Sequence, residues 1–209
     1  MTSRSNWLLP SLIIMVIVST GVLFSIMLDK PQEQPNLIKS PTVGGDFVLR
    51  NIDGRVSLED FRGSVVILYF GFLSCPEVCP TSMSILTRSL EKLSPAEKNK
   101  TKAILISIDP QRDNFQELLE FTNYYHPNIL GVTGTEQEVE KVAQQYGAFF
   151  EITASETVDS AYAYRHSSRY YIIDQQGNLI QAMRHSTTPN ELAARIKKLF
   201  QQSAFTEPS

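Results

Sequence analysis

The two cysteines of the chain, Cys75 and Cys79, stand four residues apart in the stretch GFLSCPEVCPTS, and a proline follows each of them. In a helical or near-helical turn, residues at this spacing lie about 6 Å apart at Cα, which suits two ligands of one metal ion and is also within disulfide range. A structural disulfide closing so short a loop contributes about 1–2 kcal/mol less than one closing a long loop. Metal coordination and dithiol exchange are therefore the favoured chemistries.

The residues around the pair predict where it lies in the fold. The run VVILYFGF, residues 65–72, is continuously apolar and predicts a strand buried on both faces, ending where the cysteines begin. Pro76 and Pro80 are tolerated in a turn or in the first turn of a helix, so they place the thiols at a helix N-terminus. Unpaired N–H groups and the helix dipole there favour thiolate. The carboxyl edge of such a sheet is also where open α/β folds bind ligands.

A metal at this turn needs a further ligand. Two sulfurs with one imidazole suit Cu(I) and can also hold Cu(II), whereas zinc would require a fourth ligand. The chain has three histidines, His126, His166 and His185. His166 precedes the first strand of a predicted C-terminal hairpin, which we expect beside the strand that feeds the cysteine turn. His185 follows the second strand, about 5 Å further out, and His126 lies in a helix-ending loop, where a capping or solvated role is expected. Topology therefore favours His166, although a structural role for a lone histidine stays open.

The remaining pattern alternates strands and helices. Asp-Gly at residues 53–54 predicts the turn of an opening hairpin, and AILISID at 103–109 predicts a second buried strand. Asp113 with Gln116 resembles a capping box that opens a helix to about residue 125. Further predictions are helices at about 81–93, 135–147 and 188–200 and a short helix opened by SPAE at 94–97. A short strand is predicted at 130–132, an inserted hairpin from FFEIT and AYAY, and a hairpin from RYYIID and LIQAM. This order predicts an α/β fold of thioredoxin-like type, a mixed sheet flanked by helices.

The N-terminal region differs from the rest. Residues 8–28 carry no charge, and as a helix they would be about 30 Å long, enough to cross a membrane. A signal peptide cleaved after Ser19-Thr20-Gly21 is the alternative, but the apolar run continues beyond it. We therefore expect a cytoplasmic segment at 1–7, a transmembrane anchor at 8–28, a linker at 29–45, a thioredoxin-like copper-binding domain at 46–202 and a tail at 203–209.

Composition excludes one class of partner. The formal net charge is −3, and lysines and arginines are scattered among acidic residues rather than clustered, which argues against nucleic-acid binding. With an anchor of this orientation, the domain lies outside the cytoplasm. Thiols there become a disulfide unless they are metallated or reduced, so a thiol reductant is an expected partner.

Three stretches together resemble the Sco (SenC) family of membrane-anchored copper chaperones for cytochrome c oxidase: FGFLSCPEVCPTSM, ISIDPQRDN and RHSSRYYIIDQQGNL. The resemblance covers about residues 44–200. It implies that Cys75, Cys79 and His166 bind one copper ion in a single-pass protein of the inner (cytoplasmic) membrane, with the domain on the periplasmic side. Asp109 matches the acid of the second motif. Two roles explain this acid equally well: support of the copper site, or a turn that leads into the next helix. The chain departs from the family in having Arg165 where many members are acidic, and Glu77 where Asp is commoner.

The resemblance implies delivery of copper, as Cu(I), Cu(II) or both, to the dinuclear copper A site in the copper-binding subunit of cytochrome c oxidase. The alternative is an enzyme, a thiol–disulfide oxidoreductase that reduces the cysteines of that client with Cys75 and Cys79 as its redox pair. A peroxide-reducing relative is a third possibility, but the single-cysteine, threonine-rich motif expected there is absent. Exchange chemistry requires both cysteines but not His166, whereas copper coordination requires all three.

Overall fold

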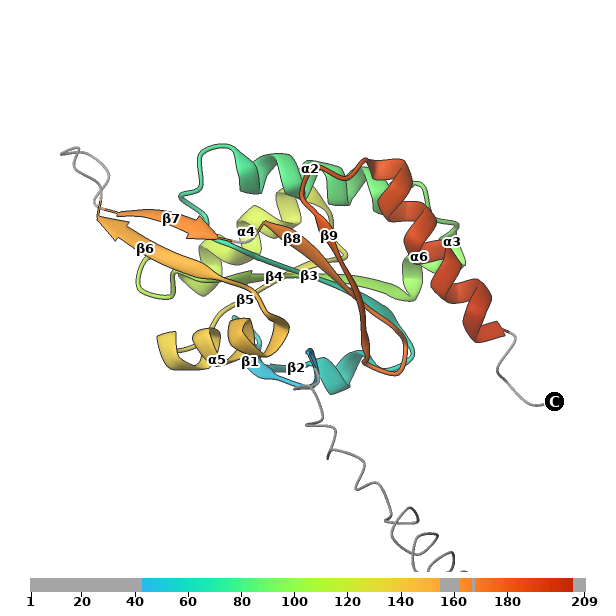
Figure 1. The fold of residues 1–209 in the computed structure, drawn as a ribbon, viewed down its shortest axis with the longest axis horizontal. Helices are drawn as coiled ribbons and strands as arrows, with labels where there is room; N and C mark the ends of the chain where they lie inside the picture. The colour runs from blue at the N-terminus through green and yellow to red at the C-terminus, as the bar shows by residue number, and fades with distance from the viewer. Residues whose placement is uncertain (1–42, 155–161, 167, 205–209) are drawn as a thin grey trace, which may run out of the picture. The chain divides into compact units, whose positions relative to one another are not determined.

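A five-stranded mixed sheet in the order β5-β4-β3-β8-β9 forms the centre of the computed structural model, which describes residues 43–154, 162–166 and 168–204 (Figure 1). Three strands run parallel: β3 (Val65–Gly71), β4 (Thr101–Ser107) and β5 (Ile129–Val132). The other two, β8 (Arg169–Ile173) and β9 (Leu179–Arg184), form an antiparallel hairpin whose first strand pairs with β3. The predicted adjacency of the cysteine-bearing strand and the C-terminal hairpin is therefore confirmed.

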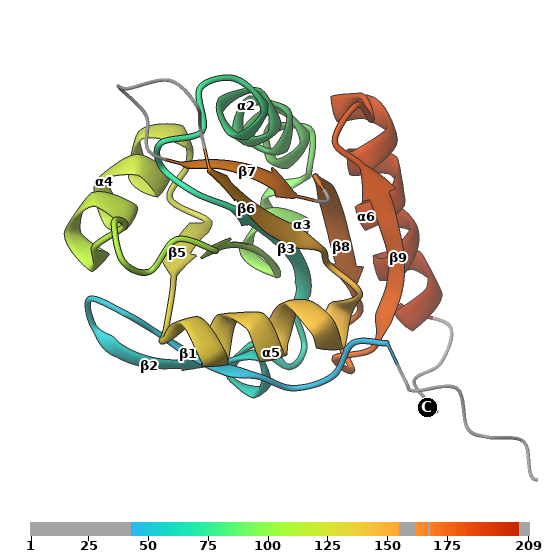
Figure 2. The ribbon, with the colours of Figure 1, turned by 60° about the vertical axis from the view of Figure 1, so that its left-hand side comes forward.

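Helices cover both faces of this sheet, which explains the unbroken apolar sequence of β3. One face carries α2 (Val78–Glu91), α4 (Phe115–Tyr125) and α6 (Pro189–Ala204). The other carries α5 (Glu136–Tyr146) and the N-terminal hairpin, and Figure 2 shows this layer on the side of the sheet opposite α2. Every residue of β3 is buried, as expected for a central strand with helices above and below it.

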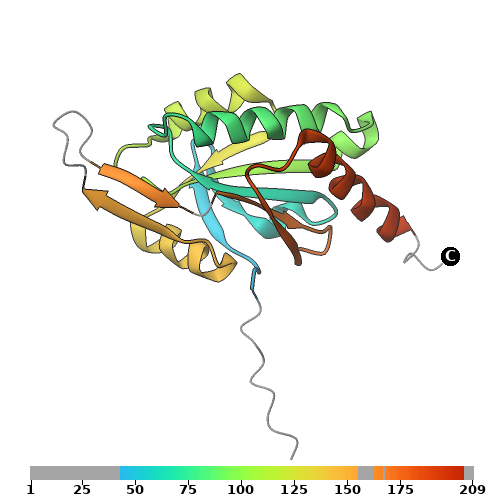
Figure 3. The ribbon, with the colours of Figure 1, turned by 45° about the horizontal axis from the view of Figure 1, so that its top comes forward.

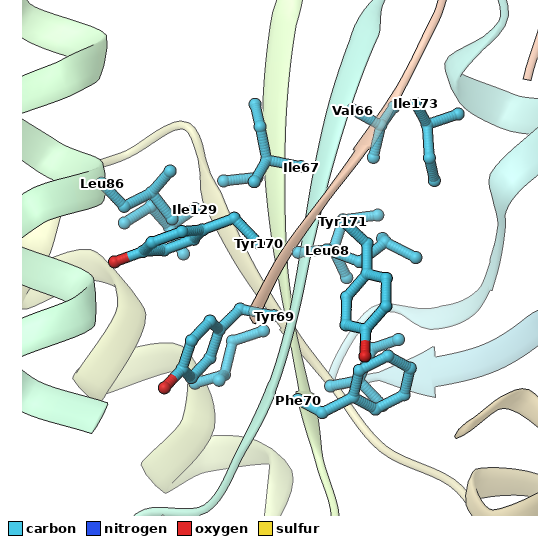
Figure 4. Packing of buried hydrophobic residues seen from close by; sticks show 14 of the residues in the cluster. Val66, Ile67, Leu68, Tyr69, Phe70, Leu86, Ile129, Tyr170, Tyr171 and Ile173 are labelled. Atoms are coloured by element: carbon cyan, nitrogen blue, oxygen red, sulfur yellow. The ribbon is translucent and has the colours of Figure 1, made fainter. Parts of the chain in front are cut away.

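Neighbouring aromatic residues of β3 point to opposite layers. Tyr69 packs against Tyr170 with ring centroids 5.5 Å apart on the α2 side. Phe70 packs edge-on against Tyr171, also at 5.5 Å (Figure 4). Tyr171 in turn contacts Tyr146 of α5. Strand alternation thus sends Tyr69 and Tyr170 to one core, and Phe70 and Tyr171 to the other. The consequence for function is that Tyr69 and Tyr170 lie on the side of the sheet where α2 begins.

The helix ends follow the sequence signals at three of the predicted sites. Ser94 and Thr135 form capping boxes at α3 (Pro95–Asn99) and α5, and Gly147 ends α5 in the left-handed conformation. Thr188 caps α6 by accepting from the Glu191 N–H, and α6 continues to residue 204, beyond the predicted end at 200. Helix α2 begins about three residues earlier than predicted, so Cys79 lies in its first turn.

The predicted capping box at Asp113 is wrong. The residue that caps α4 is Asn114, whose side chain accepts from the Glu117 N–H at 2.9 Å. Asp113 is 3% exposed, and its carboxylate points inward to other partners. The two adjacent residues have similar capping preferences, so the sequence pattern alone did not distinguish them.

Two hairpins complete the fold. The opening one, β1 (Val48–Asn51) with β2 (Gly54–Ser57), is followed by the 3₁₀ helix η1 (Leu58–Phe61). The inserted one joins β6 (Phe150–Ala154) to β7 (Tyr162–His166) and extends from the side of the domain where β3 ends (Figures 1 and 3). The described residues contain no helix with the length and apolarity to cross a membrane. The predicted anchor at 8–28 lies outside them, as do most of the linker and the tail.

Candidate metal centre

The cysteine turn leaves β3 and enters α2 within a few residues. No disulfide joins the two thiols, and both are buried; Cys75 is 8% exposed and Cys79 is 1% exposed. The Cys79 backbone N–H donates to the sulfur of Cys75 at 3.3 Å. Glu77, the residue at the N-cap position, makes no side-chain capping bond. The sulfur of Cys75 therefore accepts a hydrogen bond from one of the N–H groups that the start of a helix leaves unpaired. Negative charge is favoured at such a helix N-terminus.

The sulfur of Cys79 has its own donors. It accepts hydrogen bonds from the Phe72 backbone N–H and from the Tyr69 phenol, and it interacts with the Cys75 side chain. The hydrogen bond with Cys75, followed by burial, raises the pKa of the Cys79 thiol well above its ordinary value. Cys79 therefore keeps its proton in the reduced, metal-free protein, and a metal that binds both sulfurs must displace that proton.

Gly71, the last residue of β3, makes room for this sulfur. A Cβ built on Gly71 would lie 2.9 Å from Cys79 Sγ, 3.1 Å from Tyr69 Cε1 and 3.2 Å from Leu105 Cδ1. The first of these distances is shorter than real Cβ contacts, so any side chain at this position must displace the thiol or its surroundings. Glycine is needed here for close approach of the sulfur to the backbone.

We expect Gly71→Ala to destabilise the domain by about 1–3 kcal/mol, because overpacking a closed core costs that much. For a domain of this size the melting temperature falls by roughly 2–4 °C per kcal/mol, which thermal unfolding measures. Gly134→Ala is the comparison for overpacking without a thiol, since its Cβ would lie 2.8 Å from Oε2 of Glu138 and 3.0 Å from Cδ2 of Leu49. If Gly71→Ala is no less stable than Gly134→Ala and reacts with thiol reagents as wild type does, the close-approach interpretation is wrong.

A buried carboxylate fixes the loop that carries Cys75. Oδ2 of Asp113 accepts from the Leu73 backbone N–H at 3.0 Å and from Ser107 Oγ at 2.6 Å. Ser107 ends β4, and its hydroxyl also accepts from the Asp109 N–H at 3.1 Å. Asp113 thereby joins the end of β4 to the residue two positions before the first cysteine.

This arrangement separates the two acids of the stretch ISIDPQRDN. Asp109 is 2% exposed, its carboxylate pairs with Arg112, and its carbonyl accepts from the Arg112 and Asp113 N–H groups. It therefore stabilises the turn after β4. The acid that reaches the cysteine loop is Asp113, which the sequence analysis treated as a helix cap. Asp113 follows β4, whose C-terminal end lies next to that of β3, and this position could have predicted its contact with the cysteine loop.

The structure places His166 by its backbone. It is the last residue of β7, its Cα pairs with that of Phe150, and two residues, 167 and 168, lie between this strand and β8. Tyr170 of β8 pairs with Tyr69 of β3, so the chain that follows His166 joins the sheet at the end of β3 where the cysteine turn starts. The imidazole lies outside the described part of the structure, so its ligand role remains a prediction.

His126 is excluded from the thiol site by its position. Its N–H donates to the Thr122 carbonyl at the end of α4, which confirms the predicted capping role, and its Nδ1 accepts from the Asn128 N–H at 3.0 Å. Asn128 donates to the carbonyl of Thr101, the first residue of β4. His126 therefore lies at the N-terminal ends of the strands, whereas the cysteines follow the C-terminal end of β3. Because β3 and β4 are parallel and seven residues long, these two ends are about 20 Å apart.

His185 lies nearer to the site. It follows β9, is exposed, and its N–H donates to the Ser168 carbonyl at 3.0 Å. This places it one strand beyond β8, as predicted. Among the side chains that the structure describes, no three His, Cys, Asp or Glu residues come together as a metal site. The two thiols alone therefore account for two of the three metal ligands that the sequence predicts.

The architecture defines a class. A mixed sheet whose central strand leads through a turn with two cysteines into the following helix is a thioredoxin-like domain. Residues 35–201 match the model of the SCO1/SenC family, and the chain belongs to that family. A SCO2-like protein of Rickettsia felis is 29% identical over 204 residues, covering 94% of this chain and 99% of that protein. Protein SCO2, mitochondrial, of Saccharomyces cerevisiae is 34% identical over 145 residues, covering 69% of this chain and 48% of that protein.

Solved structures show the same fold. Arabidopsis thaliana ScoI with copper bound is 31% identical, covers 77% of this chain and 99% of its own, and has a TM-score of 0.70. Yeast Sco1 with copper bound is 28% identical, with coverages of 81% and 92% and a TM-score of 0.68. A further relative is described as having a disulfide switch in a family of cytochrome c oxidase assembly proteins, at 26% identity, coverages of 77% and 94% and a TM-score of 0.59. The predicted thioredoxin-like Sco fold is confirmed.

Proposed function

We propose that this protein binds copper through Cys75, Cys79 and His166 and delivers it to the dinuclear copper A site of cytochrome c oxidase. The observation that carries the proposal is the free, buried dithiol at the start of α2, with backbone and phenol donors on its sulfurs. The copper-bound structures of relatives support the choice of metal. Soft thiolate ligands favour Cu(I), and two thiolates with one imidazole can also hold Cu(II).

The residues present fit this cargo. The sulfur of Cys75 accepts from the N–H of Cys79 and the sulfur of Cys79 accepts from the Phe72 N–H, so both keep a hydrogen-bond donor when copper displaces the thiol protons. An imidazole at position 166 would complete a three-ligand site and leave copper open to attack by an incoming ligand. Transfer then proceeds by exchange, in which sulfurs of the client replace those of this chain one at a time. Asp113 and Gly71 keep the donor loop in place during the exchange.

We further propose a location and partners for this activity. The domain at 46–202 stands on the periplasmic side of the inner membrane, tethered by residues 29–45 to a single-pass anchor at 8–28. The client is the copper-binding subunit of the oxidase, and a thiol reductant keeps the cysteine pair reduced. The mitochondrial relatives and a Bacillus anthracis family member described as a lipoprotein are compatible with membrane attachment.

A second candidate function is thiol–disulfide exchange on the client. Cys75 is the more exposed cysteine, at 8% against 1% for Cys79, and its sulfur accepts an amide hydrogen bond, as an attacking thiolate requires. Cys79 would then serve as the resolving thiol. The relative with a disulfide switch supports this chemistry. The same pair would serve both activities, and the histidine distinguishes them.

The proposal is tested by titrating the soluble domain with Cu(I) in the presence of a competing chelator. We expect the reduced protein to bind one copper per chain and the same protein with a Cys75–Cys79 disulfide to bind none, since a disulfide has no thiolate to offer. The oxidised form is the matched control because its sequence is unchanged. Equal copper binding by the two forms, or none by the reduced form, would contradict the proposed function.

A further inference from the structure

The phenol of Tyr69 lies at the centre of a hydroxyl network behind the thiol pair. Tyr69 is completely buried in β3 and hydrogen-bonds to the sulfur of Cys79. Ser82 of α2 donates to the phenol oxygen at 2.9 Å, and Ser168 also hydrogen-bonds to it. One oxygen thus contacts the metal-site helix, the sulfur and the segment between β7 and β8.

The hydrogens of this network can be assigned by counting. A phenol has one proton to donate and two lone pairs that accept. The hydroxyl of Ser82 donates to one lone pair of Tyr69, which leaves the phenol's own proton for the sulfur of Cys79. Burial raises the pKa of Tyr69, and the phenol therefore remains a neutral donor at all physiological pH values.

We propose that Tyr69 is a positioning residue that tunes the sulfur of Cys79 through this hydrogen bond, biasing the pair toward its reduced, metal-binding form. The inference deepens the proposed function and rests on it for the copper site. A disulfide sulfur is a weaker acceptor than a thiol or thiolate, so the bond stabilises the dithiol over the disulfide. A hydrogen bond to a ligating sulfur also withdraws electron density from it, which is a recognised control of copper–thiolate potentials.

Tyr170 provides a matched control. It is the cross-strand partner of Tyr69, is equally buried, and its ring packs 5.5 Å away. Its hydroxyl donates instead to the Ser82 backbone carbonyl at 2.9 Å. It is close enough to Cys79 to interact with it electrostatically, but Cys79 accepts no hydrogen bond from it. Tyr69→Phe and Tyr170→Phe therefore each remove one buried tyrosine hydroxyl, but only Tyr69→Phe removes a hydrogen bond to the sulfur of Cys79.

The first test uses metal-free protein in glutathione redox buffers. We expect Tyr69→Phe to form its disulfide about three- to tenfold more readily than wild type, since a hydrogen bond of ordinary strength is lost from the dithiol. A tenfold change is a shift of the reduction potential by about 30 mV to more negative values. Tyr170→Phe should stay within twofold of wild type. Equal shifts in the two variants, or no shift in Tyr69→Phe, would overturn the proposal.

The second test adds Cu(II) and records the sulfur-to-copper charge-transfer band. Without the phenol proton the sulfur is a stronger electron donor, so the band of Tyr69→Phe moves to longer wavelength while that of Tyr170→Phe does not. Ser82→Ala, which leaves the phenol in place but removes a donor that orients it, should shift both readouts in the same direction by a smaller amount. If no form of the protein binds copper, the proposed function fails, and the glutathione equilibrium still decides the role of Tyr69.

Discussion

Replacing His166 by alanine is expected to weaken copper binding by more than about 100-fold while leaving dithiol–disulfide exchange largely intact. Loss of an outer partner of a metal ligand already costs about 10–100-fold, and loss of a ligand itself costs more. The thiol pair keeps its donors, because the hydrogen bonds to Cys75 and Cys79 come from β3 and α2. Competition against a Cu(I) chelator measures the first quantity, and glutathione equilibration measures the second.

The other histidines are the controls. His126→Ala removes an imidazole at the opposite edge of the sheet and should leave copper binding unchanged. His185→Ala is the sharper comparison, because that residue is bonded through its backbone to Ser168, next to the site. If His185→Ala loses copper and His166→Ala does not, the third-ligand assignment belongs to position 185. If neither loses it, the copper is held by the sulfurs without a histidine ligand.

The prediction of His166 depended on topology and on the resemblance of RHSSRYYIIDQQGNL to the Sco family. The continuous apolar run of β3 and the C-terminal hairpin identified two strands, and the thioredoxin-like order made them neighbours; the register of Tyr69 with Tyr170 confirms this. The structure then supports the ranking of the histidines by placing His126 at the far edge. What sequence alone could not give is the position of the imidazole, because that depends on how the inserted hairpin joins β8.

The donors around the sulfurs show what a sequence pattern misses. Tyr69 was part of a strand predicted from hydrophobicity, and its aromatic ring does fill the core as that pattern requires. The partner of its hydroxyl depends on which turn of α2 faces the strand, and this is a three-dimensional fact. Gly71 is similar, since its lack of a side chain becomes meaningful only when Cys79 Sγ is found against it. Apolar patterning predicts burial but not the hydrogen bonds made within it.

Asp113→Ala is expected to be the most destabilising change near the site, by about 2–4 kcal/mol. The substitution leaves the Leu73 N–H and the Ser107 hydroxyl without their shared acceptor, and a buried group left unsatisfied costs about 1–3 kcal/mol. Because Leu73 lies two residues before Cys75, the loop that holds the first sulfur loosens as well. Urea unfolding measures the stability, and the rate of Cys75 alkylation measures the loop.

Asp113→Asn is the matched variant, since its amide oxygen can accept the same two hydrogen bonds. We expect it to retain most of the stability and near-wild-type alkylation at neutral pH. An Asn variant as unstable as the Ala variant would show that the negative charge, rather than the acceptor geometry, holds the loop. An Ala variant as stable as wild type would contradict the role assigned to Asp113.

The same pair of proteins predicts a pH dependence. Burial raises the pKa of Asp113 above its ordinary value of 3.8, so the folded state binds this proton more tightly than the unfolded state does. By linkage, the stability contributed by the protonated form is fully present below pH 3.8 and is lost as pH rises through the raised value. The side chain of Asp113→Asn does not titrate in this range. As pH rises from 3.8 through the raised pKa, the wild type should therefore lose unfolding free energy relative to the Asn variant. Urea unfolding at a series of pH values measures this difference, and a difference that stays constant from pH 3 to pH 7 would show that Asp113 keeps its ordinary acidity in the folded protein.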